Sequence, residues 1–251
     1  MSSPNLPGEL LDHVVDLLHD TRDTLVNCSL VSKSWIPRAR KHLFARIRFH
    51  TATNLRSWKH NFPDPSTSPA YYVQTLSIDF PLVITAADGG WIPTFSRVVR
   101  FEVVIRSTNS RVSLVPFHGF SLVINSLHVN FTDFPPSRVF DFVTSFPLLE
   151  DLSAVSYGRF KGDHGFDEHP VGVRPSSPPA FTGSLELFLN DGMKPIASRL
   201  LSLPSGLHFR ELSLAWFDIH DVPLTMALVE SCCSTLESLS INRHLIDESD
   251  T

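Results

Sequence analysis

Histidine and acidic residues gather at one place in the sequence, and side chains of these types can bind metal ions or transfer protons. The group comprises Asp163, His164, Asp167, Glu168 and His169. Imidazole and carboxylate groups are common zinc ligands, so a hydrolase or metal enzyme built on the two histidines is one hypothesis for this chain. No cysteine is nearby, however, and the spacing matches no established ligand pattern. We therefore expect neither a metal ion nor another cofactor.

Other sequence signatures of catalysis are missing. The chain has no Gly-x-Ser-x-Gly motif, which places the nucleophile of many hydrolases on a sharp turn. It also has no glycine-rich phosphate loop behind a strand-like segment, and Asp88-Gly89-Gly90 is better interpreted as a turn. We therefore expect a protein that is not an enzyme.

The composition is that of a globular protein, with 42% hydrophobic and 19% charged residues in a chain of 251. No segment approaches the roughly 20 apolar residues that a membrane-spanning helix needs. The first ten residues show neither the basic nor the apolar region of a signal peptide. Three cysteines (Cys28, Cys232 and Cys233) provide no disulfide framework, which favours a reducing compartment. We expect a cytoplasmic or nuclear protein, or one found in both, without membrane contact.

Charge is distributed unevenly along the chain, whose net charge is −5. Residues 1–50 hold seven Lys and Arg against five Asp and Glu, whereas the remainder is acidic. A basic cluster of this size is usually a solvated surface, and no nucleic-acid-binding motif accompanies it. We therefore expect no nucleic-acid partner. The cluster consists of Arg38, Arg40, Lys41, Arg46 and Arg48.

Residues 6–44 predict three short helices. The first carries an apolar stripe at helical spacing, and Pro7 precedes it at a position where a missing N–H is harmless. A segment of about 40 residues is close to the lower limit for independent folding. Part of its apolar surface should therefore be covered, either by the rest of the chain or by a partner. The stripe consists of Leu10, Leu11, Val14, Val15 and Leu18.

Three blocks of this segment resemble an F-box in order and spacing. They are Leu6-Pro7-x-Glu9-Leu10-Leu11, then Leu30-Val31-Ser32-Lys33-x-Trp35, then Leu43-Phe44. The resemblance covers about a sixth of the chain and implies docking onto the Skp-type adaptor of an SCF ubiquitin ligase, and through it onto a cullin. A helical cap that merely seals the next domain is the alternative. The adaptor-binding positions carried over are Leu6, Pro7, Leu10, Leu11, Val14, Leu30, Val31 and Trp35.

Residues 51–72 predict a linker, with Leu55 and Trp58 indicating a short helix in its first half. Beyond it, short β-like segments recur about every 26 residues. Each has an apolar anchor residue and a second apolar residue two positions after the anchor, and most have another apolar residue three positions before the anchor. This is the pattern of leucine-rich repeats, whose units bury their apolar sides by stacking. The anchors are Leu76, Phe101, Leu127, Leu152, Leu185, Leu212 and Leu239.

The return segments between these strands are expected to be partly helical, at 137–145, 195–203 and 223–233. The asparagine that usually follows the strand of such repeats is present only at Asn190. The repeats are therefore degenerate, similar to those of fungal F-box proteins. One longer spacing is explained by a polar loop at 158–180, rich in Gly, Pro and Asp.

Alternate residues of each strand should point away from the core onto the concave face. These positions are mostly polar and mildly acidic, which suits a protein or peptide partner with basic character; a merely solvated face is the alternative. The candidate target-binding residues are Asp79, Arg100, Glu102, His128, Asn130, Asp151, Glu186, Phe188, Glu211 and Asn242.

The sequence thus predicts an α/β protein with a three-helix F-box domain at 1–50, a linker at 51–72 and an open solenoid of about seven leucine-rich-repeat-like units at 73–251. Parallel strands should line its concave side, with helices or irregular segments on the convex side. By resemblance, it is the substrate-recognition subunit of an SCF-type ubiquitin ligase that binds an unknown target. A scaffold outside any ligase, or a repeat-only binding module, is the alternative hypothesis.

Overall fold

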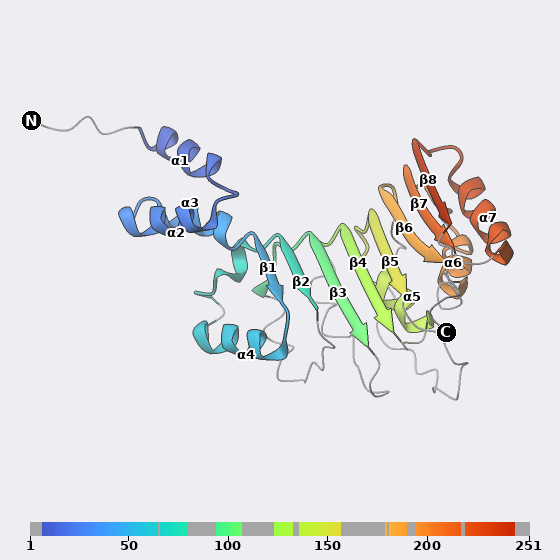
Figure 1. Ribbon diagram of the computed structural model, residues 1–251, viewed down its shortest axis with the longest axis horizontal. Helices are drawn as coiled ribbons and strands as arrows, with labels where there is room; N and C mark the ends of the chain where they lie inside the picture. Colours follow the sequence, from blue (N-terminus) through green and yellow to red (C-terminus); the bar gives the residue numbers. More distant parts are fainter. Residues whose placement is uncertain are drawn as a thin grey trace, which may run out of the picture.

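The computed structural model describes residues 7–64, 66–79, 94–106, 123–132, 136–156, 179, 181–189, 194–216 and 219–243. Within these residues the protein is an α/β structure with one open sheet of eight parallel strands (Figure 1). Three helices lie beyond one end of the sheet: α1 (Gly8–Leu17), α2 (Arg22–Val31) and α3 (Ile36–Leu43). The strands are β1 (Arg46–Phe49), β2 (Thr75–Ile78), β3 (Arg100–Arg106), β4 (Ser126–Thr132), β5 (Asp151–Ser156), β6 (Ser184–Leu189), β7 (Glu211–Trp216) and β8 (Ser238–Arg243).

The strands lie side by side in the order in which they occur in the chain. All seven strands expected from the repeat are present as β2 to β8, and their anchors lie opposite one another on neighbouring strands. The structure adds a strand ahead of them, because β1 pairs with β2 and places Ile47 opposite Leu76. The sheet therefore begins within the segment predicted as the first domain.

Six of the strands, β2 to β5, β7 and β8, start with the same hydrogen-bond arrangement. The carbonyl oxygen of Ala45 accepts hydrogen bonds from the backbone N–H groups of Gln74 and Thr75, at 2.8 and 2.9 Å. The carbonyl oxygen of Gln74 accepts an equivalent pair of hydrogen bonds from the N–H groups of Val99 and Arg100. Further pairs of this kind follow along the sheet. This ladder satisfies backbone groups that would otherwise be left unpaired where the chain turns into these strands. It also fixes the register of neighbouring units.

The anchors of β2 to β7 form the centre of the hydrophobic core, together with the apolar residues on either side of each anchor. All six anchors are almost completely buried. The last strand differs, because Leu239 and Ile241 are 45% and 40% exposed. In β4 buried and half-buried residues alternate as the sequence pattern predicts for a strand with one face in the core, whereas Ser77 in β2 and Val155 in β5 are buried on the opposite face.

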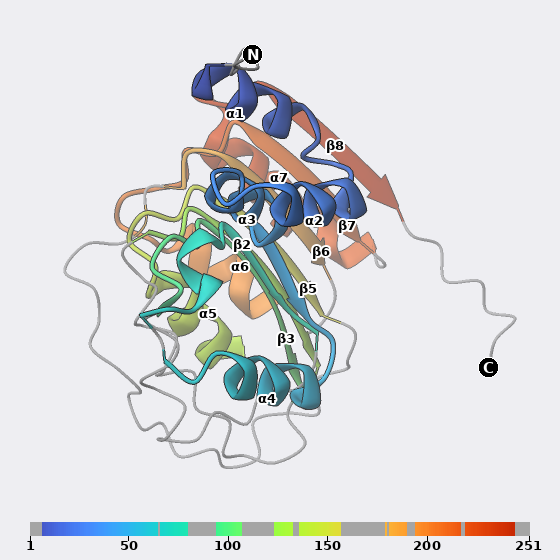
Figure 2. The same ribbon diagram turned by 90° about the vertical axis from the view of Figure 1, so that its left-hand side faces the viewer.

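Three helices cover the apolar face of the sheet: α5 (Pro136–Thr144), α6 (Lys194–Leu201) and α7 (Val222–Cys232). Figure 2 shows α5 and α6 on one side of the strands. They confirm the three predicted helical return segments to within a few residues. Cys232 is buried in the core at the end of α7, and burial raises the pKa of its thiol. Apart from Pro179, the predicted loop at 158–180 lies outside the described residues, as does Asn190.

The predicted linker contains the expected helix, α4 (Ala52–Asn61), followed by a short 3-10 helix, η1 (Pro69–Tyr72). Thr51 and Asn54 form a capping box at the start of α4: the Thr51 hydroxyl accepts from the Asn54 N–H, and the Asn54 side chain accepts from the Thr51 N–H. The Trp58 ring lies within 6.3 Å, centroid to centroid, of four phenylalanine rings, which fixes α4 against the start of the sheet. These rings belong to Phe44, Phe49, Phe62 and Phe95.

Helices α1, α2 and α3 form what we call the helical unit, with a small core of its own. Val15, Leu25 and Ala39 are buried together, one from each helix, and this cluster is separate from the core of the sheet. Leu18, Trp35 and Leu43 pack around it. The three predicted helices are thus confirmed. With Cys28, which is also buried, the unit has four buried side chains, and these are few for a folded unit.

Candidate interaction surfaces

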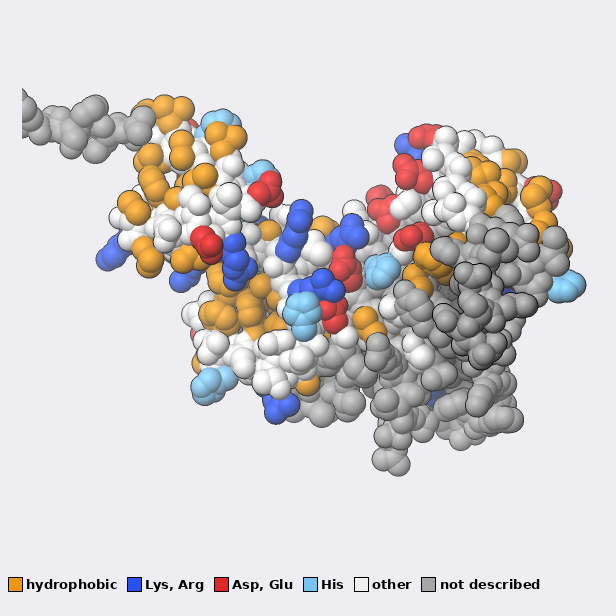
Figure 3. All heavy atoms as spheres, viewed as in Figure 1, with side chains coloured by type: hydrophobic (Ala, Val, Ile, Leu, Met, Phe, Trp, Pro, Cys, Tyr) orange, Lys and Arg blue, Asp and Glu red, His pale blue; other side chains and the backbone are white. Residues whose placement is uncertain are grey.

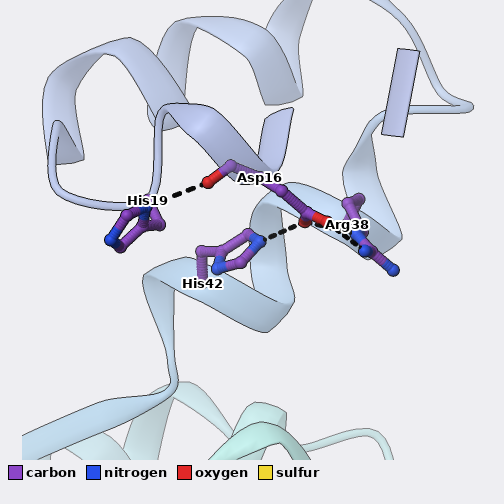
Figure 4. A network of polar contacts seen from close by, with 4 residues as sticks. All are labelled: Asp16, His19, Arg38 and His42. Atoms are coloured by element: carbon purple, nitrogen blue, oxygen red, sulfur yellow. Dashed lines mark hydrogen bonds and ion pairs between the residues drawn. The ribbon is translucent and has the colours of Figure 1, made fainter. Parts of the chain in front are cut away.

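A polar clasp joins the end of α1 to α3 (Figure 4). The Arg38 guanidinium donates to both carboxylate oxygens of Asp16, with Nε 2.6 Å from Oδ1, and His42 Nε2 lies 2.7 Å from the same Oδ1. The Arg38 guanidinium, followed by His42, holds the pKa of Asp16 well below its usual range. Charge-assisted contacts of this kind are stronger than neutral hydrogen bonds. The clasp therefore fixes the rotation of α1 on α3.

This rotation divides the apolar residues of α1 into two rows. Val15 is buried in the small core, Leu18 packs against it, and Leu11, one turn before Val15, is half-buried. Leu10, Val14 and Leu17 belong to the neighbouring row and are exposed. Both rows have helical spacing, so α1 has more apolar surface than the unit can bury.

Helix α2 presents exposed apolar residues as well. Together, α1 and α2 carry six Leu and Val side chains that are between 41% and 80% exposed. Figure 3 shows hydrophobic side chains gathered over the helical unit. Contiguous exposed apolar surface is uncommon on monomeric proteins and marks interaction sites. We call these six residues the apolar surface: Leu10, Val14, Leu17, Val26, Leu30 and Val31.

The eight residues carried over from the F-box resemblance occupy three kinds of position. Leu10, Val14, Leu30 and Val31 belong to the apolar surface, whereas Pro7 is exposed where α1 begins. Leu11 is half-buried, and Trp35 packs against the small core. Leu6 lies outside the described residues. The structure also adds two residues that the F-box resemblance did not select. They are Leu17 and Val26, which are large, apolar and exposed.

A second surface is formed by the side of the sheet opposite the buried anchors, which we call the polar face. Nine of the ten candidate target-binding residues occupy strand positions on this face, and Asp79 follows directly after β2. Figure 3 shows it hollowed between the helical unit and the last strands. Phe188 is half-buried and Glu211 is exposed, so the face contains both apolar and charged groups.

Ion pairs on the polar face begin at β1, with residues that the sequence prediction did not include. Arg48 Nε lies 2.6 Å from Asp79 Oδ2, and His50 Nδ1 lies 2.8 Å from the same oxygen. Burial raises the pKa of Asp79, but hydrogen bonds from Arg48 and Ser77 outweigh it and hold this pKa below its ordinary value. On β3, Arg100 Nε lies 3.0 Å from Glu102 Oε1.

A sequence signal for β1 exists. Phe44, Ile47 and Phe49 have the spacing that marks the other strands, with apolar residues three positions before and two positions after the anchor. The intervening arginines Arg46 and Arg48 then fall on the polar face by strand alternation. Their assignment to the end of a basic helix concealed this pattern.

A chain of hydrogen bonds crosses the middle of the polar face. Ser153 Oγ donates to Glu186 Oε2 at 2.6 Å, and His128 Nδ1 lies 2.8 Å from Ser153 Oγ. Because the hydroxyl has only one proton, His128 must be the donor in its contact. A catalytic serine needs a histidine that accepts its proton, with the acid behind the histidine. Here the serine lies between the other two residues, so the arrangement fixes side chains instead of activating a nucleophile.

The metal-site hypothesis falls outside what the structure describes, because His164 and His169 lie outside the described residues. Within the described ranges, no group of three His, Cys, Asp or Glu side chains is placed to hold a metal ion. Among the helices that the structure describes, none is long and apolar enough to cross a membrane.

Comparisons of the chain with protein-family models, with curated proteins and with solved structures found no match.

Proposed function

We propose that this protein is the substrate-recognition subunit of an SCF-type ubiquitin ligase. In this proposal the helical unit is an F-box that binds a Skp-type adaptor, and the sheet is a degenerate leucine-rich-repeat arc that binds the target protein. The chain performs no covalent chemistry. It raises the concentration of the target near the ubiquitin-transfer machinery, so its contribution is proximity alone.

The observation that carries this proposal is the apolar surface. Six large apolar side chains lie exposed on two helices whose own core contains only three fully buried residues. Burying an exposed Leu or Val stabilises a complex by about 1.5 to 3 kcal/mol per side chain. A helical unit built in this way gains stability by binding a partner. Four of the six residues are those that the F-box resemblance assigns to the adaptor.

The stacked strands support the second half of the proposal. Units of one strand and one return segment, spaced about 26 residues apart and aligned at their anchors, are the arrangement expected for leucine-rich repeats. Their polar face presents side chains from eight neighbouring strands on one surface. An extended surface of this kind is suited to a protein or peptide.

The test is binding of the purified chain to a purified Skp-type adaptor, measured by calorimetry. We expect Leu10→Asp combined with Leu30→Asp to weaken binding about 100-fold, since two apolar contacts of about 1.5 kcal/mol each are lost. Both positions are exposed, so the variant should remain folded. Trp35 is a poorer choice because it packs against the small core.

The matched control is Leu148→Asp, which changes a side chain 55% exposed outside the helical unit. It should bind the adaptor as the wild type does. If the folded wild type does not bind the adaptor, the ligase assignment is wrong. The protein would then be a repeat-based binding module or a scaffold outside any ligase.

A further inference from the structure

The first residues of the strands form one row across the polar face, and the charged residues in this row are regularly spaced. Going along the sheet, this row has Arg46 on β1, Arg100 on β3, Asp151 on β5 and Glu211 on β7. The strands between them contribute only Thr or Ser to the row. Two positive positions are therefore followed by two negative ones, at intervals of two strands.

The rest of the polar face has the same polarity. At the β1 end, three arginines outnumber Asp79 and Glu102, to which Arg48 and Arg100 are paired. Among the described polar-face positions from β4 to β8, carboxylates occur without any Lys or Arg. Arg210 at the far rim lies 3.8 Å from Glu237, which offsets its charge. Figure 3 shows Lys and Arg side chains over the first strands and acidic side chains continuing toward the last ones.

The four row residues have capacity left for a ligand. Arg46 and Glu211 are exposed. Arg100 uses its Nε toward Glu102, and a guanidinium has five N–H donors in total. Asp151 accepts from the backbone N–H and the hydroxyl of Ser184, and both bonds end on the same oxygen, Oδ1.

The spacing of the row matches that of an extended polypeptide. Neighbouring strands lie about 4.8 Å apart, so charges two strands apart are separated by about 9.6 Å. In the extended polyproline II conformation a chain has three residues per turn and rises about 3.1 Å per residue, so every third side chain lies on the same side, about 9.3 Å apart. A chain in this conformation that crosses the strands along this row therefore presents every third side chain to successive charged positions.

We propose that the polar face binds an extended segment of its partner protein with acidic side chains at the first and fourth positions and basic side chains at the seventh and tenth. The acidic pair lies over Arg46 and Arg100, and the basic pair over Asp151 and Glu211. This inference rests on the proposed role of the sheet in target binding and specifies the chemistry of the target. It also revises the sequence-based expectation of a simply basic partner, because β1 adds positive charge.

The test is a selection of displayed ten-residue peptides on the immobilised full-length chain. The library places Glu, Lys or Ser independently at positions one, four, seven and ten, with Gly and Ser elsewhere. We expect peptides with two Glu followed by two Lys, or the reverse order for a chain bound in the opposite direction, to be enriched at least tenfold over peptides with four Lys. Adding salt should reduce this enrichment, because surface charges are screened.

The informative variant combines Arg46→Glu with Arg100→Glu, which should transfer the preference to peptides with four Lys. Its control combines Arg22→Glu with Arg56→Glu, which makes the same change in net charge on exposed positions of α2 and α4. The control should keep the wild-type preference. No enrichment, enrichment of four-Lys peptides on the wild type, or the same preference in both variants would overturn the inference.

Failure of this inference about the polar face can be distinguished from failure of the ligase assignment. Adaptor binding depends on the apolar surface of the helical unit, which the peptide selection does not involve. If adaptor binding is retained while the charge preference is absent, only the present inference is wrong. If the charge preference is found while the adaptor does not bind, the ligase assignment is wrong and the binding surface stands.

Discussion

At the scale of single residues, Asp16 has the greatest influence on the proposed adaptor site, although it does not belong to the apolar surface. Its carboxylate joins α1 to α3 through Arg38 and His42. The rotation of α1 that results turns Leu10, Val14 and Leu17 outward. Asp16 is therefore a positioning residue in this account.

We expect Asp16→Asn to reduce the stability of the helical unit at neutral pH by about 1 kcal/mol, because the partly exposed clasp loses its charge. The pKa of Asp16 in the folded protein lies well below its ordinary value of 3.8. A carboxyl with a lowered pKa stabilises the folded state above its unfolded pKa, and this contribution is lost as the pH falls toward the folded pKa. The wild-type unit should therefore weaken below about pH 4.

Denaturant unfolding followed by the fluorescence of Trp35, in chains whose other tryptophans are replaced by Phe, measures this effect. Asp16→Asn should show a smaller loss of stability between pH 5 and pH 3 than the parent chain. An equal loss in both chains would show that the clasp does not carry the charge dependence.

Glycine is required at position 183 because neighbouring atoms approach it closely, and not because of its backbone conformation. A Cβ atom at this position would lie 2.2 Å from Asp151 Oδ1 and 3.2 Å from the backbone carbon of Glu150. We expect Gly183→Ala to destabilise the protein by about 1 to 3 kcal/mol, as overpacking does, and to displace the Asp151 carboxylate from Ser184. Gly8→Ala is the control, since nothing lies within 4 Å of its added Cβ. Equal unfolding midpoints in urea for the two variants would contradict this reasoning.

At the scale of elements, α4 shows how a short helix can stabilise one end of the sheet. Its capping box satisfies backbone groups at the helix start, and Trp58 joins it to the aromatic rings around β1. Thr51→Ala should therefore cost about 1 kcal/mol of stability. Thr53→Ala makes the same chemical change at an exposed position within α4 and should be close to neutral. Thermal unfolding compares the two, and a larger effect of Thr53→Ala would refute the role of the cap.

Most elements could be predicted from the sequence because their apolar spacing is unambiguous. The anchors of β2 to β8 recur at a near-constant interval, so their strands and shared register followed from the repeat. β1 was missed because Arg46 and Arg48 continue the charge pattern of α3, and its anchor Ile47 precedes Leu76 by a longer interval that contains α4.

The candidate sites were predictable only in part. On α1, the rows containing Leu10 and Leu11 are both apolar, and only the packing of α1 against α3 decides which row is buried. Trp35 belongs to the resemblance, yet its indole lies against the small core. The charge pattern of the polar face includes Arg46 on β1. It could not be predicted while residues 46–49 were not recognised as a strand.

At the scale of the whole molecule, two separate cores predict two degrees of stability. The helical unit buries Val15, Leu25 and Ala39, whereas the sheet has an extended core across its strands. We expect Val15→Ala to cost about 2 kcal/mol and to increase amide hydrogen exchange in α1 to α3 while leaving β3 to β7 protected. Leu127→Ala should increase exchange across the sheet. Loss of protection in the sheet of Val15→Ala would show that the two cores unfold together.

The most direct test of the account is amide hydrogen exchange of the full chain with and without a Skp-type adaptor. The account predicts slower exchange in α1 and α2 when the adaptor is bound, with the strands of the polar face unchanged, because the adaptor and the target use different surfaces. Leu10→Asp combined with Leu30→Asp should abolish the change, and Leu148→Asp should preserve it. Unchanged exchange in the helical unit at saturating adaptor, or protection on the polar face in its place, would contradict the central claim.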